Sequence, residues 1–505
     1  MKCYLIRNFF ITGALALSIS GCSSIENSHR QKSDMMEAYQ TGNNAAAVQE
    51  IDYKLREPKW YNTSVVNTGD ELMWRLEAGS LAFHQGDFKT SVNAFKKAEE
   101  LIKEYDERAR ISLRDAGAEA GAALTNSNAL PYRGFCRDRL ALSIYKSLAY
   151  LGTGNESAFR AQIRRLRAEQ KRVQDEYREF FEAEKAELAA AKESNPDAAK
   201  KAEATADQSK LQNEPQNKEF SAGLEEVRKV AHRGYGNFLN PAAIFLSGLS
   251  SIRDEQYDNA RIDFQRLYEA MPQNPMIKQY YVTMLQKAGR EIPAELKDVK
   301  PFDFTLNQDC VYVVMGNGRG AAFKQIAIYF PIMTAWPMCE FYPAPFSGLK
   351  AEADGKTYAS CLLADMDGVI AQEYHERLTI MITRIVLNTL IKEGAYYGGL
   401  AAILSSNMDP VVKLIVLTSV AIGGAIYRAA MNTADTRSWE LLPKEFQLTQ
   451  FPMPENRVIS LDLQGDNAHI KRTVQIPDDC KSAIIYVSAP SPQNVRFHVL
   501  PIKTK

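Results

Sequence analysis

Histidine and carboxylate side chains are the residues in this sequence that could hold a metal ion or transfer protons. The six histidines are scattered, and no two stand at the helical spacing of a zinc site. The acidic residues between Asp365 and Glu376 suggest paired carboxylates, but Asp365-Met366-Asp367-Gly368 lacks the length and the closing glutamate of a calcium loop. We expect Asp365, Asp367, Glu373 and Glu376 to cap a helix start, where backbone donors are unsatisfied. The sequence predicts no metal site.

The glycine-rich run from Met315 to Gly320 could cradle a phosphate group. It lacks the Lys-Ser/Thr pair that a phosphate loop places at its helix start, and Lys324 lies in a strand pattern instead. A hairpin turn between two strands explains these glycines better. No serine lies in a nucleophile-elbow motif. We therefore predict no catalytic residue and no cofactor, and an unrecognised hydrolase is the least favoured hypothesis.

One cysteine carries a different chemical signal. Lys2 and Arg7 flank an apolar run that is too short to span a membrane permanently, which is typical of a signal peptide. The run ends in Ile19-Ser20-Gly21-Cys22, which resembles the lipobox that bacterial lipoprotein signal peptidase cleaves after the cysteine sulfur takes a diacylglycerol. We expect residues 1–21 to be removed and Cys22 to be lipidated. A secretory signal with a chance cysteine is the alternative.

The lipid on Cys22 would hold the chain on a bilayer without a spanning helix. Ser23 stands where an aspartate would retain a lipoprotein in the inner membrane, so we favour the outer membrane, facing the periplasm. A short polar tether, residues 22–33, would connect the anchor to the folded part.

Composition limits the other partners. Lys+Arg and Asp+Glu both number 61, so the chain offers no net attraction to nucleic acid or to anionic lipid. We predict protein partners and no small-molecule substrate. An oxidising envelope permits disulfides among four C-terminal cysteines, whose pairing the sequence does not determine: Cys310, Cys339, Cys361 and Cys480.

Helical pairs dominate residues 34–292. The clearest pair, Asp70 to Glu104, fits the tetratricopeptide pattern, with Ala78 and Gly79 where two helices cross and Gly86-Asp87-Phe88 at the turn. A second copy runs from Ile244 through Gly248 and Phe264 to Leu267, and weaker copies surround 36–56 and 140–166. We predict an α-solenoid of such hairpins. A generic helical bundle is the alternative.

The stretch 161–218 is rich in Arg, Glu, Lys and Ala, with apolar residues only on a narrow stripe. It is interrupted at Asn195-Pro196. We expect a charged helical arm or hairpin that projects from the solenoid, with a solvated face as its main character.

After Arg290 the pattern changes to short strands, which predicts a β-rich domain over 301–505 and an α+β fold for the whole chain. A strand, a turn and a strand occupy 301–329, and further strands follow from Val458. Two apolar helices are expected near 373–392 and 411–431. The apolar run in the second is below the ~20 residues of a spanning helix, so we favour packing within the protein over membrane insertion or an oligomer interface.

The most distinctive cluster of this domain is Asp435, Arg437 and Trp439. An aspartate and an arginine this close commonly form an ion pair that orders a loop, with the tryptophan packed over it. We favour this structural role over a ligand site.

Several segments resemble a family of largely uncharacterised bacterial lipoproteins that join tetratricopeptide-like repeats to a C-terminal β-containing domain. The segments are Ser143 to Gly152, Ala364 to Asp367 with Thr383-Arg384-Ile385, and Ala434 to Trp439 with Leu442-Pro443. The resemblance covers most of the mature chain and departs from it in the charged arm. It implies partners among envelope lipoproteins related to the curli-secretion pore or to penicillin-binding-protein activators, and it implies no catalytic residue.

Two hypotheses of function follow. In the first, the protein is an anchored scaffold of an envelope complex, and the groove of the stacked repeats binds a partner. In the second, the two C-terminal apolar helices act on the membrane as part of a pore or transport assembly. The candidate partner-binding residues of the first hypothesis are aromatic: Trp74, Phe83, Phe88, Phe245, Tyr257 and Tyr281.

Overall fold

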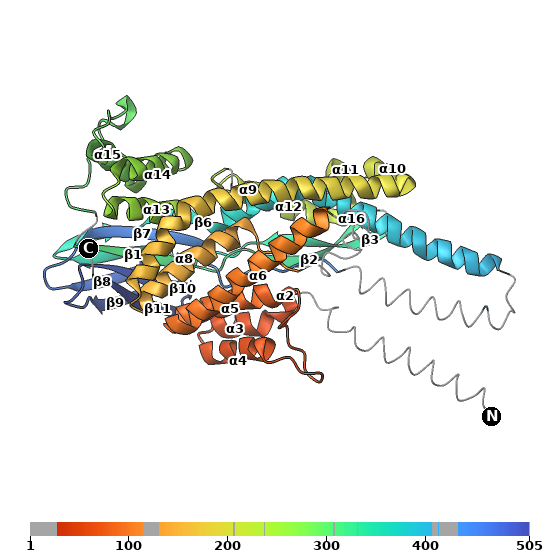
Figure 1. The fold of residues 1–505 in the computed structure, drawn as a ribbon, viewed down its shortest axis with the longest axis horizontal. Coiled ribbons are helices and arrows are strands. Elements are labelled where there is room, and N and C mark those ends of the chain that lie inside the picture. The colour runs from red at the N-terminus through yellow and green to blue at the C-terminus, as the bar shows by residue number, and fades with distance from the viewer. Residues whose placement is uncertain are drawn as a thin grey trace.

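The structure is a computed structural model that describes residues 28–503, except 115–130, 206–207, 237, 307–308, 331, 407–412 and 414–432. It is an α+β fold, as the sequence predicted, with helices in the first part of the chain and most strands in the second (Figure 1). Cys22 and the apolar helix expected near 411–431 lie outside the described residues.

The helices begin earlier than expected. The sequence predicted a polar tether over 22–33, but Ser28–Gln31 form the short helix α2, and Lys32 behind it is fully buried. Short turns then join neighbouring helices into pairs. The bounds are α3 (Ser33–Gln40), α4 (Asn44–Leu55), α5 (Glu71–Gln85), α6 (Phe88–Arg114), α8 (Cys136–Gly152), α9 (Glu156–Ser194), α13 (Pro241–Arg253), α14 (Tyr257–Ala270) and α15 (Pro275–Lys287).

Small residues allow the paired helices to cross closely, as the sequence predicted. A Cβ atom on Gly79 of α5 would stand 2.5 Å from the Phe95 ring of α6, so only glycine lets that ring pack against the helix backbone. Gly248 of α13 has the same relation to the Phe264 ring of α14, at 2.7 Å. The two clearest helical pairs of the sequence are therefore present.

The stretch 161–218 does not project freely, so the expected arm needs correction. α9 does continue as one helix and ends at Ser194, with Asn195 as its C-cap, which agrees with the interruption predicted at Asn195-Pro196. Its distal part is packed, however, because Leu188 joins a hydrophobic core with the later helix α16 (Met366–Ser405). Glu184 of α9 also accepts a hydrogen bond from Arg377 of α16 at 2.7 Å. The chain then passes through α10 (Pro196–Thr205), α11 (Gln208–Asn213), the 3-10 helix η3 (Pro215–Asn217) and α12 (Lys218–Ala231).

The described strands form three sheets. A five-stranded sheet has the order β11-β10-β1-β7-β6, a four-stranded sheet has the order β5-β4-β8-β9, and β2 pairs with β3. The bounds are β1 (Cys310–Asn317), β2 (Ala322–Phe330), β3 (Ile332–Glu340), β4 (Gly348–Ala353), β5 (Lys356–Ala359), β6 (Cys361–Asp365), β7 (Glu445–Pro452), β8 (Val458–Gln464), β9 (His469–Gln475), β10 (Ser482–Ser491) and β11 (Asn494–Ile502).

The hairpin expected at the glycine-rich turn is wrong, although both of its strands exist. β1 pairs in parallel with β10 and in antiparallel with β7, so neither of its edges is open to β2. The glycines let the chain leave the sheet close to another segment. The Gly320 amide donates to the Leu442 carbonyl at 2.8 Å, and a Cβ atom at Gly320 would lie only 3.0 Å from that oxygen.

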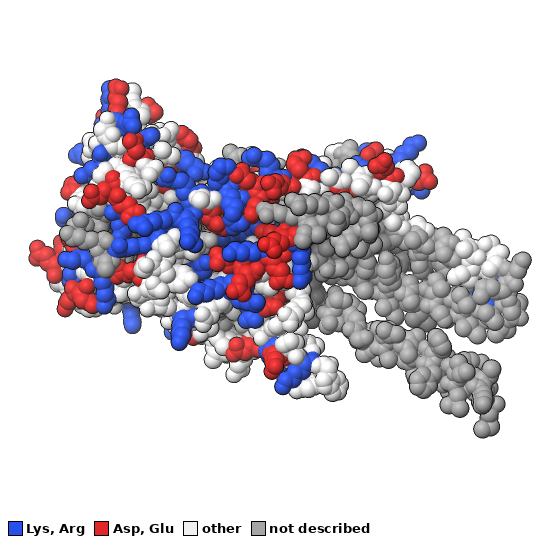
Figure 2. All heavy atoms as spheres, in the orientation of Figure 1, with Lys and Arg blue, Asp and Glu red and all other residues white. Residues whose placement is uncertain are grey.

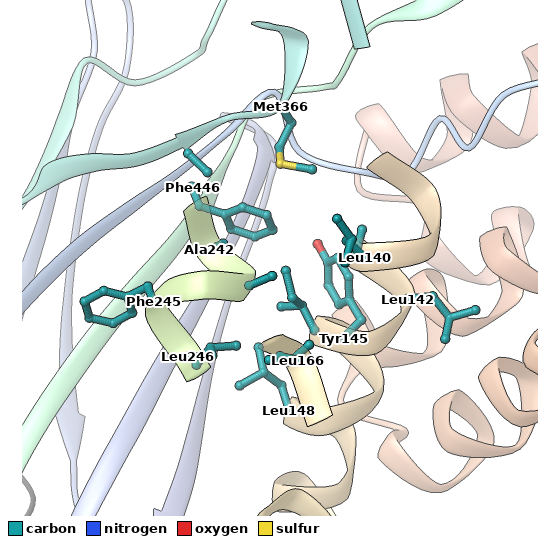
Figure 3. Close-up of a cluster of buried hydrophobic side chains, with 14 of the residues drawn as sticks. Leu140, Leu142, Tyr145, Leu148, Leu166, Ala242, Phe245, Leu246, Met366 and Phe446 are labelled. Atoms are coloured by element: carbon teal, nitrogen blue, oxygen red, sulfur yellow. The ribbon is translucent and has the colours of Figure 1, made fainter. Parts of the chain in front are cut away.

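The five-stranded sheet is buried on both faces. Val311 and Val313 of β1 join a core with Leu461 of β8, so the two larger sheets pack face to face as a β-sandwich. Tyr312 lies on the opposite face of β1, in the core that the sheet shares with the helices. Figure 3 shows part of this shared core, in which Phe446 of β7 lies among side chains of α8 and α13. The helical and β-rich regions are therefore one packed unit.

α16 extends beyond this unit toward one end of the molecule (Figure 1). It begins before the helix expected at 373–392 and continues after it. Of the four carboxylates expected to cap it, Asp365 does so by accepting the Gly368 amide at 2.9 Å. Asp367 and Glu373 instead accept amides of distant segments, those of Ala321 at 2.7 Å and Cys136 at 3.0 Å, and Glu376 accepts from the Gln372 side chain. Among the described residues, no helix combines the length and the apolar character that crossing a membrane requires.

Candidate functional site

The first helices of the described chain meet a C-terminal segment at a buried group of charges, which we call the junction: His29, Lys32, Glu77, Arg319 and Glu440. Lys32 is its centre. Its Nζ lies 3.1 Å from Glu77 of α5 and 2.9 Å from Glu440, and all three side chains have no solvent exposure. A buried ammonium group without partners would be very unfavourable, so these contacts fix where Lys32 can lie.

Backbone groups complete the junction. Glu77 accepts the amides of Glu440 and Leu441 at 2.8 and 3.0 Å, and Lys32 donates to the Ser438 carbonyl at 2.5 Å. Arg319 lies 2.5 Å from the second oxygen of Glu440. Each carboxylate is therefore held by two or more donors, and the segment around Glu440 cannot leave α5 without exposing buried charge.

The pKa values of the two carboxylates of the junction are shifted in opposite directions. Burial raises the pKa of Glu77, Lys32 counteracts this, and the nearby Glu440 adds to it. Burial alone would also raise the pKa of Glu440, but Lys32, His29 and Arg319 outweigh burial and hold it well below its usual range. The junction thus keeps Glu440 ionised, and its stability depends on the cations around that carboxylate.

The first described residue, Ser28, lies against the same segment. Its hydroxyl is 3.1 Å from the Thr436 hydroxyl, and His29 Nδ1 is 3.4 Å from Glu440. Ser28 and His29 are therefore held against the segment that carries Glu440.

The cluster expected at Asp435, Arg437 and Trp439 belongs to this segment. Arg437 pairs with Asp435 at 2.7 Å and also reaches Asp70 beside α5 at 3.2 Å. Trp439 is fully buried, and its indole N–H donates to Ser80 of α5 at 2.8 Å. The ion pair and the packed tryptophan are present, and both attach residues 433–442 to the first predicted repeat.

Most of the aromatic residues predicted to bind a partner are core residues instead. Trp74, Phe83, Phe245 and Tyr281 are at most 7% exposed, so they offer no surface to another protein. Phe83 is buried against the sheet, with its ring 5.0 Å from the Tyr486 ring of β10. Phe245 and Tyr281 instead pack against neighbouring helices, with their rings 5.9 Å from Phe264 and 5.5 Å from Tyr268. Phe88 and Tyr257 are half-buried.

One of these residues does line a hollow. An open hollow of about 590 Å³ lies between the α5–α6 turn and the α8–α9 turn. Its lining includes Phe88, Lys89, Lys96, Tyr150 and Asn155. A Cβ atom on Gly152 would stand 2.4 Å from the Phe88 ring, which shows how closely the two turns approach below the hollow.

The described residues contain no cluster of His, Cys, Asp and Glu that could hold a metal ion. The disulfides that the envelope would permit are also not formed among the described cysteines. Cys339 is buried, and burial raises the pKa of its thiol well above the usual range.

Sequence reasoning missed Lys32, Glu77 and Glu440 as a group because they come from segments far apart in the chain. One signal was available: Glu77 stands in the middle of the apolar helix from Leu72 to Phe83. A carboxylate at such a position needs a buried partner, although the sequence does not say which cation supplies it.

No protein-family model matches the chain, and no curated protein or solved structure matches it either.

Proposed function

We propose that this chain is a lipoprotein of a bacterial envelope, anchored through Cys22, that works as a binding scaffold for a protein partner. The observation that carries the proposal is the junction. It fixes Ser28, which follows the lipobox cysteine by only six residues. A fully extended link of this length spans about 20 Å, so an anchored body would stay close to the bilayer in a restricted range of orientations.

The resemblance to envelope lipoproteins, the signal sequence and the lipobox support the anchoring part of the proposal. The outer membrane, with the body in the periplasm, fits Ser23 after the cysteine. The paired helices support the scaffold part, because a tetratricopeptide-like solenoid is an architecture that commonly binds peptides.

The partner surface in this proposal is the hollow between the α5–α6 and α8–α9 turns. Lys89 and Lys96 line it together with the rings of Phe88 and Tyr150, while Asp87 is the one carboxylate of its lining. The Lys96 ammonium group lies 5.9 Å from the Tyr150 ring centre. Such a surface suits an acidic, extended segment of a protein partner, whose carboxylates would meet the two lysines.

The test is a crosslinked pull-down of the tagged protein from envelopes, read by mass spectrometry. Mass analysis of the N-terminal peptide of the same sample measures whether Cys22 carries lipid. We expect the variant Lys89→Glu/Lys96→Glu to lose a specific envelope partner that the wild type recovers. The matched control is Lys350→Glu/Lys356→Glu, which reverses two exposed lysines on β4 and β5 and should keep the partner.

Equal recovery of partners by both double variants would refute the hollow as the binding surface. An unmodified Cys22 in the mature protein would refute the anchor.

A second candidate function, action on the membrane by the apolar C-terminal helices, is favoured by one observation. α16 extends past the packed unit, and Leu404 near its end is 60% exposed (Figure 1). The discriminating variant begins at Ser23 behind a cleavable secretory signal, so that it carries neither lipid nor leader. The scaffold proposal expects this variant in the soluble fraction, whereas the membrane-active function expects it to remain with the membranes.

A further inference from the structure

Exposed aromatic rings are concentrated in one short stretch of the described chain. Trp60 is 96% exposed, Tyr61 is 66% exposed and Tyr53 is 49% exposed. The other exposed large apolar side chains are single residues on separate elements: Ile262, Met333, Leu362 and Leu404. A group of this kind on a folded protein marks an interaction surface.

Tyr53 lies in the last turn of α4, and the loop after it, which carries Trp60 and Tyr61, is internally hydrogen-bonded. The Asn62 side chain accepts the Lys59 amide at 3.2 Å and donates to the Glu57 carbonyl at 2.9 Å. The Ser64 hydroxyl donates to the Arg56 carbonyl at 2.6 Å, and Val65 donates to the Lys54 carbonyl at 2.9 Å. The exposure of Trp60 and Tyr61 is therefore set by a defined loop, at the tip of which the two rings stand edge to face, 5.5 Å apart.

Basic groups accompany the rings, on a molecule whose visible face carries Lys and Arg interspersed with Asp and Glu (Figure 2). The Arg56 guanidinium lies 3.7 Å from the Tyr53 ring centre, and Lys59 Nζ lies 6.0 Å from that of Tyr61. Tryptophan and tyrosine beside lysine and arginine are the side chains that concentrate at the interface between a bilayer and water. At such an interface, tryptophan and tyrosine rings enter the headgroup region, and the cations of lysine and arginine contact lipid phosphates.

The position of the loop agrees with a bilayer. α3 and α4 form a helical hairpin joined by a short turn, so the residues before α3 and those after α4 lie at the same end of the pair. Ser28 to Lys32 come just before α3, and the aromatic loop follows α4. Figure 1 shows this loop protruding toward the end of the molecule to which α16 extends. One side of the molecule thus carries Ser28, where the link from the proposed anchor would join the folded part, together with the aromatic loop and the exposed end of α16.

We infer that this side faces the membrane and that Trp60 and Tyr61 insert into the bilayer interface beside the lipid anchor. The inference rests on the proposed anchoring at Cys22 and adds an orientation to it. A protein held by lipid alone could rotate on its link, whereas a second contact through the loop sets which face meets the bilayer.

The chain offers a direct probe, because Trp74, Trp336 and Trp439 have no exposure and Trp60 is almost fully exposed. The full lipidated protein is reconstituted on vesicles of phosphatidylethanolamine and phosphatidylglycerol, and tryptophan emission is quenched with acrylamide or with brominated lipid. We expect the Trp60 signal to shift to the blue, to lose its acrylamide quenching and to gain quenching by brominated lipid. Trp60→Phe should abolish all three changes.

A matched control places a tryptophan at the other end of the molecule. Ile262 is 41% exposed, and α14, the helix that carries it, lies far from the aromatic loop along the long axis in Figure 1. In the Trp60→Phe background, Ile262→Trp should remain open to acrylamide and insensitive to brominated lipid on the same vesicles.

The outcomes separate the two proposals. If Cys22 carries lipid and the protein is bound to vesicles but Trp60 stays open to acrylamide, the orientation is wrong and the anchor stands. If Trp60 is shielded in native envelopes but open on pure vesicles, a protein covers the loop and the bilayer assignment is overturned. If Cys22 carries no lipid, the anchoring proposal fails and this inference fails with it.

Discussion

Removal of the Lys32 ammonium group should be among the most damaging single changes that the described helices allow. In Lys32→Met the side chain keeps a similar length, but Glu77 and Glu440 lose the cation that lies 3.1 and 2.9 Å from them. Breaking a buried ion pair from one side commonly costs 3–5 kcal/mol, because the remaining charge has no partner.

The structure places the expected loss at the lower end of that range. Arg319 stays 2.5 Å from Glu440, and Glu77 keeps the amides of Glu440 and Leu441. We therefore expect Lys32→Met to lower the free energy of unfolding by about 3 kcal/mol. Adding Glu77→Gln should recover about half of this loss, because the amide oxygen still accepts from the backbone and the repulsion between two carboxylates is removed.

Urea unfolding followed by tryptophan fluorescence measures both values, since Trp74 and Trp439 are buried in the surrounding core. Lys103→Met is the matched control, because Lys103 is an exposed lysine of α6 and should change the free energy of unfolding by less than about 0.5 kcal/mol. A loss in Lys32→Met that equals the control would refute the junction as a stabilising contact. A double variant that loses the sum of both single losses would refute the coupling between Lys32 and Glu77.

Two further predictions concern pH and packing. Burial raises the pKa of Glu373 to about 8, so the folded state holds a proton that the unfolded state releases above about pH 4. The free energy of unfolding should therefore fall by about 3 kcal/mol between pH 5 and 8. Glu373→Gln should remove most of that dependence in urea titrations, and an unchanged pH profile would contradict the assignment. Gly79→Ala should lower the free energy of unfolding by about 1–3 kcal/mol, because its Cβ would meet the Phe95 ring at 2.5 Å. Gly394→Ala, whose Cβ would have no atom within 4 Å, should be neutral or stabilising. Thermal melts in which Gly394→Ala is the less stable variant would contradict the close packing of α5 against α6.

The helical part of the fold was predictable because its signals are local. The spacing of Gly79 and Phe88 and the proline at 275 each act within one helical pair, so a short window of sequence contains the whole argument. The β-rich part was predicted less well. β3 contains Pro337 in its interior, and β4 to β6 are short, so neither composition nor length distinguished them from loops.

Long-range pairing explains the remaining errors. Nothing near the glycine-rich turn shows that β7 and β10 occupy both edges of β1. The charged stretch was expected to be solvated, but Glu184 meets Arg377 and also Arg384, at 3.3 Å, and both arginines lie about 200 positions later in the chain. The partners of a run of charged residues can come from distant segments of the chain, so the sequence pattern alone predicts that such a run is exposed to solvent.

The two-sided burial of the five-stranded sheet narrows where a partner can bind. Helices cover one face of β1 and the smaller sheet covers the other, so the helix faces that pack against β1 are already occupied by the protein itself. The surfaces that the proposed function leaves for a partner are the outer turns of the helical pairs and open strand edges such as β9, most of whose side chains are exposed. Of these surfaces, the turns at Phe88 and Tyr150 have a hollow, aromatic rings and two lysines together. In the proposed function, the paired helices therefore support the sheet, and the partner contacts the turns at their ends.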